Sequence, residues 1–122
     1  MKKLLMTLMI AGLLSVGTTT VSAQTAPKSV IHVVTVSWKT GTTPEQIKAA
    51  LDGVQALPAQ FKGITRVWTK SIKVQGGKAN AIVMEFADEA ALKAYVDSPA
   101  QKEWYKVYMS IREESTTFDI TN

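Results

Sequence analysis

Apolar and β-branched residues cluster in the stretch of residues 30–38, VIHVVTVSW, which predicts a β-strand. Successive side chains of a strand point to opposite faces. One face of this strand would carry His32, Val34, Val36 and Trp38, and the other Ile31, Val33, Thr35 and Ser37. The second face is apolar at one end and hydroxylic at the other. We therefore expect both faces of the strand to be covered.

Two similar motifs predict the starts of the first and last helices. Thr43-Pro44-Glu45-Gln46 supplies a hydroxyl N-cap, a proline at the first helical position and a glutamine that can close a capping box. Ser98-Pro99-Ala100-Gln101 follows the same plan, and we expect Gln101 to reach back to the N–H group of the cap residue. The first helix would end at Pro58. The last helix carries apolar residues at helical spacing, at Trp104, Val107, Tyr108 and Ile111.

The segment between these helices predicts two antiparallel strands and a short helix. The strands would cover residues 64–74 and 79–86, joined by a turn at residues 75–78. Asp88-Glu89 would start the short helix, with Leu92, Tyr95 and Val96 on its apolar side, and residues 115–120 would form the last strand. The order strand, helix, strand, strand, broken helix, strand is that of the ferredoxin-like β-α-β-β-α-β fold, in the α+β class.

A four-stranded antiparallel sheet with helices on one face leaves its other face to be covered. The simplest cover is a second copy of the chain, and a sheet-to-sheet homodimer would close a barrel between the two subunits. A domain of this size buries a modest core, so association would also stabilise it.

The first 23 residues have the layout of a secretory signal peptide. Lys2 and Lys3 precede an apolar run over residues 4–14, and small or β-branched residues lead to Ala23. The apolar run is shorter than the roughly 20 residues that span a bilayer. We expect cleavage after Ala23, a flexible leader over residues 24–29 and one domain over residues 30–122. The mature protein would be periplasmic or secreted, with no membrane attachment after cleavage.

Charge and residue counts argue against several kinds of partner. The formal net charge is +4, and it falls to +2 when Lys2 and Lys3 leave with the signal peptide. This imbalance is too weak to indicate nucleic-acid binding. The chain has no cysteine and a single histidine, His32, so we expect neither a disulfide nor a dedicated metal site, and no cofactor.

Several short motifs follow one another along the mature chain in a characteristic order and spacing. They are His32-Val33-Val34 to Trp38-Lys39, Leu57-Pro58 with Gly63-Ile64, residues 91–96, residues 98–101 and Phe118-Asp119. In this order and spacing, from about Val30 to Thr121, the chain resembles the stress-responsive α/β-barrel domain family, also called Dabb or dimeric α+β barrel proteins. The resemblance implies a homodimer and a pocket between the sheet and the helices of each subunit.

The resemblance does not imply one chemistry. A few relatives cyclise polyketides with a histidine in the turn after the position of Tyr95 and a tyrosine nearby. In this chain that turn is Ser98-Pro99-Ala100-Gln101, and Asn80 stands where such a cyclase carries another histidine. Of that constellation only His32 and Tyr95 remain. Gln101 cannot act as a general base near neutral pH, so helix capping accounts for it better than catalysis does.

The resemblance and the missing histidines together favour an exported homodimer that binds a small apolar or aromatic molecule without catalysis, or a stress-associated accessory protein. Candidate pocket residues are His32, Val34, Trp38, Asn80, Ile82, Met84, Tyr95, Gln101 and Trp104. The alternative is a cofactor-independent cyclase-like, isomerase-like or monooxygenase-like enzyme, with His32 as acid or base and Tyr95 as the orienting phenol. A third alternative is a structural oligomer whose interior is filled by side chains.

Overall fold

The computed structural model of the chain describes residue 17 and residues 27–122. The elements, in chain order, are β1 (Val30–Trp38), α1 (Pro44–Gln60), β2 (Ile64–Trp68), β3 (Asn80–Phe86), α2 (Glu89–Tyr95), α3 (Pro99–Ile111) and β4 (Arg112–Ile120). The predicted ferredoxin-like α+β fold is confirmed. The predicted signal peptide and its cleavage after Ala23 lie outside the described residues, as does the leader up to residue 26. Among the helices that the structure describes, none is long and apolar enough to cross a membrane.

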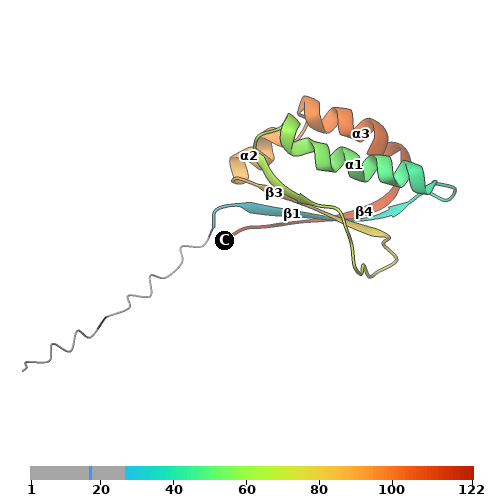
Figure 1. Ribbon diagram of the computed structural model, residues 1–122, viewed down its shortest axis with the longest axis horizontal. Helices are drawn as coiled ribbons and strands as arrows, with labels where there is room; N and C mark the ends of the chain where they lie inside the picture. The colour runs from blue at the N-terminus through green and yellow to red at the C-terminus, as the bar shows by residue number, and fades with distance from the viewer. Residues whose placement is uncertain (1–16, 18–26) are drawn as a thin grey trace, which may run out of the picture.

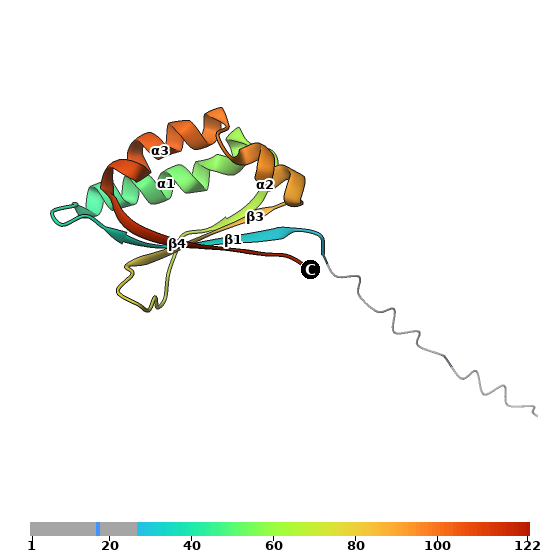
Figure 2. The ribbon, with the colours of Figure 1, turned by 180° about the vertical axis from the view of Figure 1, so that it is seen from behind.

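The four strands form one sheet in the order β2-β3-β1-β4, and every neighbouring pair is antiparallel. All three helices cover the same face of this sheet (Figures 1 and 2). The connection between β2 and β3 projects from the sheet on the side away from the helices (Figures 1 and 2). The two faces of the sheet therefore have different surroundings within one subunit.

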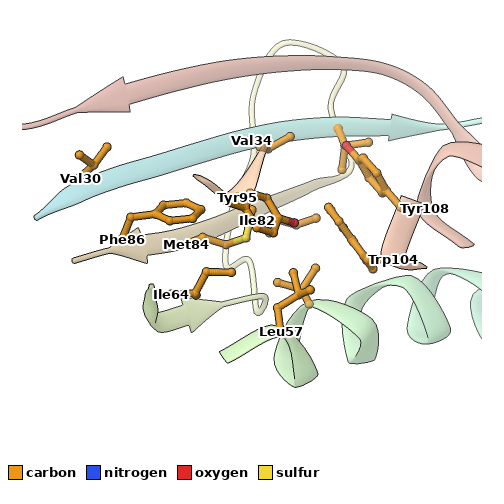
Figure 3. Close-up of a cluster of buried hydrophobic side chains, with 12 residues drawn as sticks. Val30, Val34, Leu57, Ile64, Ile82, Met84, Phe86, Tyr95, Trp104 and Tyr108 are labelled. Carbon is orange, nitrogen blue, oxygen red and sulfur yellow. The ribbon is translucent and has the colours of Figure 1, made fainter. Parts of the chain in front are cut away.

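The hydrophobic core lies between the sheet and the helices (Figure 3). Phe86, Ile82 and Met84 of β3 share the covered face, as their spacing of two residues predicts, and none is more than 1% exposed. Leu57 and Val54 of α1 are completely buried against them. Alternation on the strands and helical spacing on α1 thus place their apolar positions in one core.

The predicted start of α1 is confirmed. The Thr43 side chain accepts a hydrogen bond from the Gln46 N–H at 3.2 Å, and Gln46 Oε1 accepts one from the Thr43 N–H at 2.9 Å. The predicted end is wrong, because α1 continues through Pro58 to Gln60. A proline so close to the end of a helix removes only the bond to the carbonyl of Val54, and the Phe61 N–H still bonds to the carbonyl of Leu57 at 2.8 Å.

The predicted strand over residues 64–74 is too long, because β2 ends at Trp68. After Trp68, the backbone of β3 forms hydrogen bonds with the Ser71 side chain in place of the β2 backbone. The Ser71 hydroxyl accepts a hydrogen bond from the Ala81 N–H at 2.8 Å and donates one to the Ala81 carbonyl at 3.2 Å. Gly76 and Gly77 then form the predicted turn with φ angles of 71° and 72°, a region that favours glycine. The segment between Trp68 and Asn80 is therefore a loop.

The last strand starts three residues earlier than predicted. Helix α3 ends at Ile111, and β4 follows at once from Arg112, which pairs with Trp38 across a bulge in the register. Residues 112–114 read as polar loop in the sequence, because an edge strand with one exposed side carries few apolar residues. This early start places Arg112 and Ser115 beside the covered face of the sheet.

The face of the sheet away from the helices, here called the open face, carries an apolar row across all four strands. Trp68 of β2 pairs with Val83 of β3, Val83 with Val33 of β1, and Val33 with Phe118 of β4. Residues directly opposite one another in a sheet share a face. Trp68 is 44% exposed and Phe118 is 54% exposed. In the part of the chain that the structure describes, no helix or strand covers this row (Figures 1 and 2).

One ion pair lies beside the apolar row. Arg66 donates from Nε and Nη2 to the two carboxylate oxygens of Glu85, at 2.8 Å and 3.0 Å. The Arg66 guanidinium, with a hydrogen bond from Thr65 and one from Ser29, lowers the pKa of Glu85 to about 2 against the cost of burying the carboxylate. Glu85 therefore stays ionised on the open face, with its charge matched by Arg66.

Candidate functional site

A cavity of about 210 Å³ lies between the sheet and helices α2 and α3. Six of the predicted pocket residues line it, namely His32, Val34, Met84, Tyr95, Gln101 and Trp104. Seven lining residues were not predicted: Leu92, Val96, Tyr105, Tyr108, Arg112, Ser115 and Thr117. The interior of the subunit is thus not completely filled by side chains.

Three predicted pocket residues are not part of the lining. Ile82 is completely buried in the core. Trp38 and Asn80 lie further along the sheet, where the Trp38 indole donates from Nε1 to the amide oxygen of Asn80 at 2.8 Å. The three residues point to the same face as His32, but the alternation of a strand fixes only the face and not the position along it. The Asn80 oxygen thus bonds to the Trp38 indole and not to a group in the cavity.

Aromatic rings form one wall of the cavity. Trp104 stacks on Tyr108, with ring centroids 4.4 Å apart and an interplanar angle of 11°. The Trp104 indole donates from Nε1 to the carbonyl of Ala50 in α1 at 2.9 Å, so its polar tip has a partner, as the sequence predicts. A Cβ atom at Gly53 would lie 2.7 Å from Cδ1 of Trp104, and only glycine leaves room for the indole there. Helices α1 and α3 therefore fix the orientation of this wall.

Two phenols of the cavity are deeply buried. Tyr95 is 2% exposed and Tyr108 is 3% exposed. Neither hydroxyl has a hydrogen-bond partner with good geometry among the described residues. Burial raises the pKa of Tyr95 above its usual range and also that of Tyr108, where Ser115 and Arg112 nearby offset part of the rise. Both phenols stay protonated and keep a hydrogen to donate.

Gln101 holds the turn between α2 and α3. Its N–H donates to the Ser98 hydroxyl at 3.2 Å, which confirms Ser98 as the N-cap. Its side-chain oxygen accepts from the N–H of Asp97 at 2.7 Å, one residue before the predicted donor, the N–H of Ser98. Asp97 has a φ of 63°, and this left-handed conformation turns its N–H toward the glutamine. The Gln101 amide then donates to the Tyr105 hydroxyl at 3.2 Å.

His32 forms a pair with Asp119 at the edge of the cavity. The sheet register places the two residues directly opposite each other on β1 and β4, and Nδ1 of His32 lies 2.5 Å from Oδ1 of Asp119. The His32 side chain is 17% exposed and that of Asp119 is 45% exposed. With the carboxylate at Nδ1, the neutral ring carries its hydrogen there and keeps Nε2 as an acceptor. The Phe86 ring packs edge-on against the imidazole, with centroids 6.0 Å apart.

The lining residues of β4 that were not predicted from the sequence lie on a face of the strand without apolar residues, so no hydrophobic pattern marks them. Ser115 and Thr117 alternate with outward residues on a strand that is polar on both sides, and the bulge in the register puts Arg112 on the same side as them. Their register with Trp38, Val36 and Val34 places them on the covered face. Alternation counted back from Asp119 finds Thr117 and Ser115 once β4 is paired with β1, but it passes over Arg112 because of the bulge. Among the residues that the structure describes, no group of three or more histidine, aspartate or glutamate side chains could hold a metal ion.

The sequence matches the family model described as "Stress responsive A/B Barrel Domain", or Dabb, over residues 30–122. The chain belongs to the Dabb family. A comparison of the sequence with curated proteins found no match. The resemblance inferred from short motifs is thus confirmed over the whole of the described domain.

Solved structures share the ferredoxin-like fold of this chain. A Dabb family protein from Mesorhizobium loti has a TM-score of 0.65 at 21% identity, covering 77% of this chain and 96% of that one. A dimeric ferredoxin-like protein from Bacteroides fragilis has a TM-score of 0.65 at 17% identity, covering 80% and 100%. The hydroxynitrile lyase from Passiflora edulis has a TM-score of 0.70 at 17% identity, covering 79% and 94%. At these identities the likeness shows the fold alone.

Proposed function

We propose that the protein is an exported homodimer that binds a small apolar or aromatic molecule in the cavity of each subunit. The observation that carries this proposal is the cavity itself, which combines a stacked aromatic wall with two buried phenols whose hydroxyls have no hydrogen-bond partner of good geometry among the described residues. Binding sites for small molecules have this composition, mostly apolar with a few placed polar groups. A polar atom of a ligand would satisfy a hydroxyl that the fold leaves unmatched.

The size of the cavity limits the ligand to about one ring. In another protein, a dry cavity of about 150 Å³ holds benzene. The cavity here, of about 210 Å³, therefore has room for one ring with a small substituent. Two Dabb-fold neighbours are described as dimeric, which supports the homodimer. In that assembly the open faces pack together and the cavities lie on the outer, helical sides of the barrel.

A bulky residue at the mouth of the cavity tests the binding site. Val96 lines the cavity and is 55% exposed, so we expect Val96→Trp to fill its opening without disturbing the core. Binding of benzamide, followed by ligand-observed NMR on protein purified after expression of the full chain, should weaken about tenfold or more in this variant. The steric cause is the loss of space for the ring.

Val107→Trp is the matched control, because Val107 is an exposed valine of α3 outside this cavity. It should bind benzamide as the wild type does. Native mass spectrometry of the wild type gives a second readout, since a ligand retained through purification would add a defined mass to the dimer. Equal binding by both tryptophan variants would place the ligand elsewhere, and a wild type that binds no single-ring compound would contradict the proposal.

A second candidate function is acid–base catalysis, and the pairing of His32 with Asp119 favours it. A histidine held by a carboxylate at Nδ1 offers Nε2 as a proton acceptor beside a bound molecule. One structural neighbour is a hydroxynitrile lyase. Cleavage of a cyanohydrin removes the proton of its hydroxyl, a step that a general base assists. Tyr95 would then orient the substrate through its phenol.

Turnover of an aromatic cyanohydrin measures this second function directly. If the chain releases benzaldehyde from mandelonitrile above the uncatalysed rate, His32→Gln should lower that rate about 100-fold or more, since general base catalysis contributes that much. Asp119→Asn should lower it in the same direction, because the amide no longer fixes the tautomer of the ring. An unchanged rate in His32→Gln would remove the histidine from the mechanism, while binding of benzamide would be unaffected by that result.

A further inference from the structure

The cavity is lined by an arginine that has no acidic partner among the described residues. The lining contains Arg112 and His32 and no aspartate or glutamate. Asp119 faces His32 from outside this lining, so the histidine already has an acidic partner. Arg112 has none, since no carboxylate among the described residues forms an ion pair with it. The cavity therefore holds a guanidinium charge that the described chain does not match.

The neighbours of Arg112 hold its position but leave the charge unbalanced. Its Nη1 donates to the Ser115 hydroxyl at 3.1 Å, and its guanidinium carbon lies 5.8 Å from the centre of the Tyr108 ring. Both partners are neutral. Arg66, the other arginine of the chain, shows the usual alternative, because it binds Glu85 through two parallel hydrogen bonds. Arg112 has no such carboxylate among the described residues, and it lines the cavity.

Other polar groups of the lining add hydrogen-bond donors. The Tyr105 hydroxyl accepts a hydrogen bond from the Gln101 amide, so its own hydrogen is left for another acceptor. The Tyr108 hydroxyl is protonated and has no acceptor of good geometry. Ser115, already an acceptor for Arg112, also keeps its hydrogen. An arginine surrounded by such donors is a site for an acceptor group with negative charge.

We propose that the cavity binds a single-ring aromatic carboxylate, with Arg112 as the residue that binds the carboxylate. The inference rests on the proposed small-molecule binding function and names the chemical class of the ligand. Trp104, Met84 and Leu92 supply apolar surface for the ring. The carboxylate faces Arg112, where two N–H groups can bind two oxygens at once. The volume of the cavity admits one ring with such a substituent.

A purely structural role for Arg112 makes different predictions. The residue caps the C-terminus of α3, where a positive charge interacts favourably with the helix dipole. If Arg112 has only that role, removing its charge changes the stability of the fold. That role gives no reason for the cavity to distinguish a carboxylate from a neutral group of the same shape. The ligand preference, measured in the wild type, therefore separates the two roles without any mutation.

Benzoate and benzamide are the probes for this preference, since they differ in charge and hardly in shape. With the purified homodimer, ligand-observed NMR should show benzoate binding about tenfold more tightly than benzamide, as hydrogen bonds to charged groups are the stronger ones. Equal affinity for the two probes would overturn the carboxylate assignment and leave the proposed binding function in place. Binding of neither probe would overturn both.

Variants then assign the preference to one residue. Arg112→Gln should reduce the ratio of benzoate to benzamide affinity to about one, with little change for benzamide, and Arg112→Lys should keep part of the preference. Lys102→Gln removes a charge from an exposed position of α3 and should keep the wild-type ratio. A preference that persists in a folded Arg112→Gln protein, checked by circular dichroism, would contradict the role of this arginine.

Discussion

Replacing Val33 with aspartate is expected to convert the homodimer into monomers. Val33 lies in the middle of the apolar row on the open face, between Val83 and Phe118. In the proposed dimer this row packs against a second copy. A carboxylate buried there without a partner costs several kcal/mol for each subunit. Each 1.4 kcal/mol changes a dissociation constant tenfold, so the dimer would weaken by more than about 1,000-fold.

Light scattering coupled to size-exclusion chromatography, over a range of protein concentrations, gives the mass of each species. Val107→Asp is the control, because it places the same charge on an exposed valine of α3 on the helical side of the subunit. This variant should remain dimeric. A folded Val33→Asp protein with the mass of a dimer would show that another surface forms the interface, and a monomeric wild type would contradict the homodimer itself.

The proposed interface also explains the composition of the open face. Thr35 and Ser37 follow Ile31 and Val33 on the same face of β1, so the face changes from apolar to hydroxylic along the strand. The ion pair between Arg66 and Glu85 lies at the apolar end and keeps its two charges matched. An interface with an apolar centre and paired charges beside it is what a stable protein–protein contact requires. A solvated face would not need this arrangement.

Local patterns in the sequence were sufficient to predict the fold. The alternation of β1 and β3 assigned their two faces, and the motif at Thr43 fixed the first turn of α1. These features depend on residues close together in the chain. The error at the end of β2 lies where a single side chain, that of Ser71, competes with the backbone. The strand propensity of a residue does not show such a competition, because it averages over the hydrogen bonds that a serine side chain can make.

The candidate site was less predictable, since its parts come from distant segments. His32 and Asp119 are 87 positions apart, and only the register of β1 with β4 brings them together. Arg112 was missed because the start of β4 reads as a polar loop. The residue pattern gives the face on which a side chain lies, and the register gives its neighbours. Six of the nine predicted pocket residues lie at the cavity, because the residue pattern assigned their side chains to the correct face. Trp38, Asn80 and Ile82 lie on that face but outside the lining, because only the register determines which residues are neighbours.

The largest loss of stability is expected from Phe86→Ala. Phe86 is completely buried at the end of β3, where its ring packs against Tyr95 at a centroid distance of 5.3 Å and against His32 at 6.0 Å. Truncating a buried phenylalanine to alanine lowers the free energy of unfolding by about 3–5 kcal/mol. Small domains have about 5–15 kcal/mol in total, so this variant would be close to unfolding. Urea denaturation followed by circular dichroism measures the change.

Phe118→Ala separates the contribution of the core from that of the interface. Phe118 is the same residue type, but it lies on the open face and is 54% exposed within one subunit. Its truncation should leave the unfolding of the monomer nearly unchanged and reduce the stability that the dimer adds, which depends on protein concentration. The loss in Phe86→Ala should be the same at every concentration. If the two variants lost equal stability in the monomeric background of Val33→Asp, the assignment of the two faces of the sheet would be wrong.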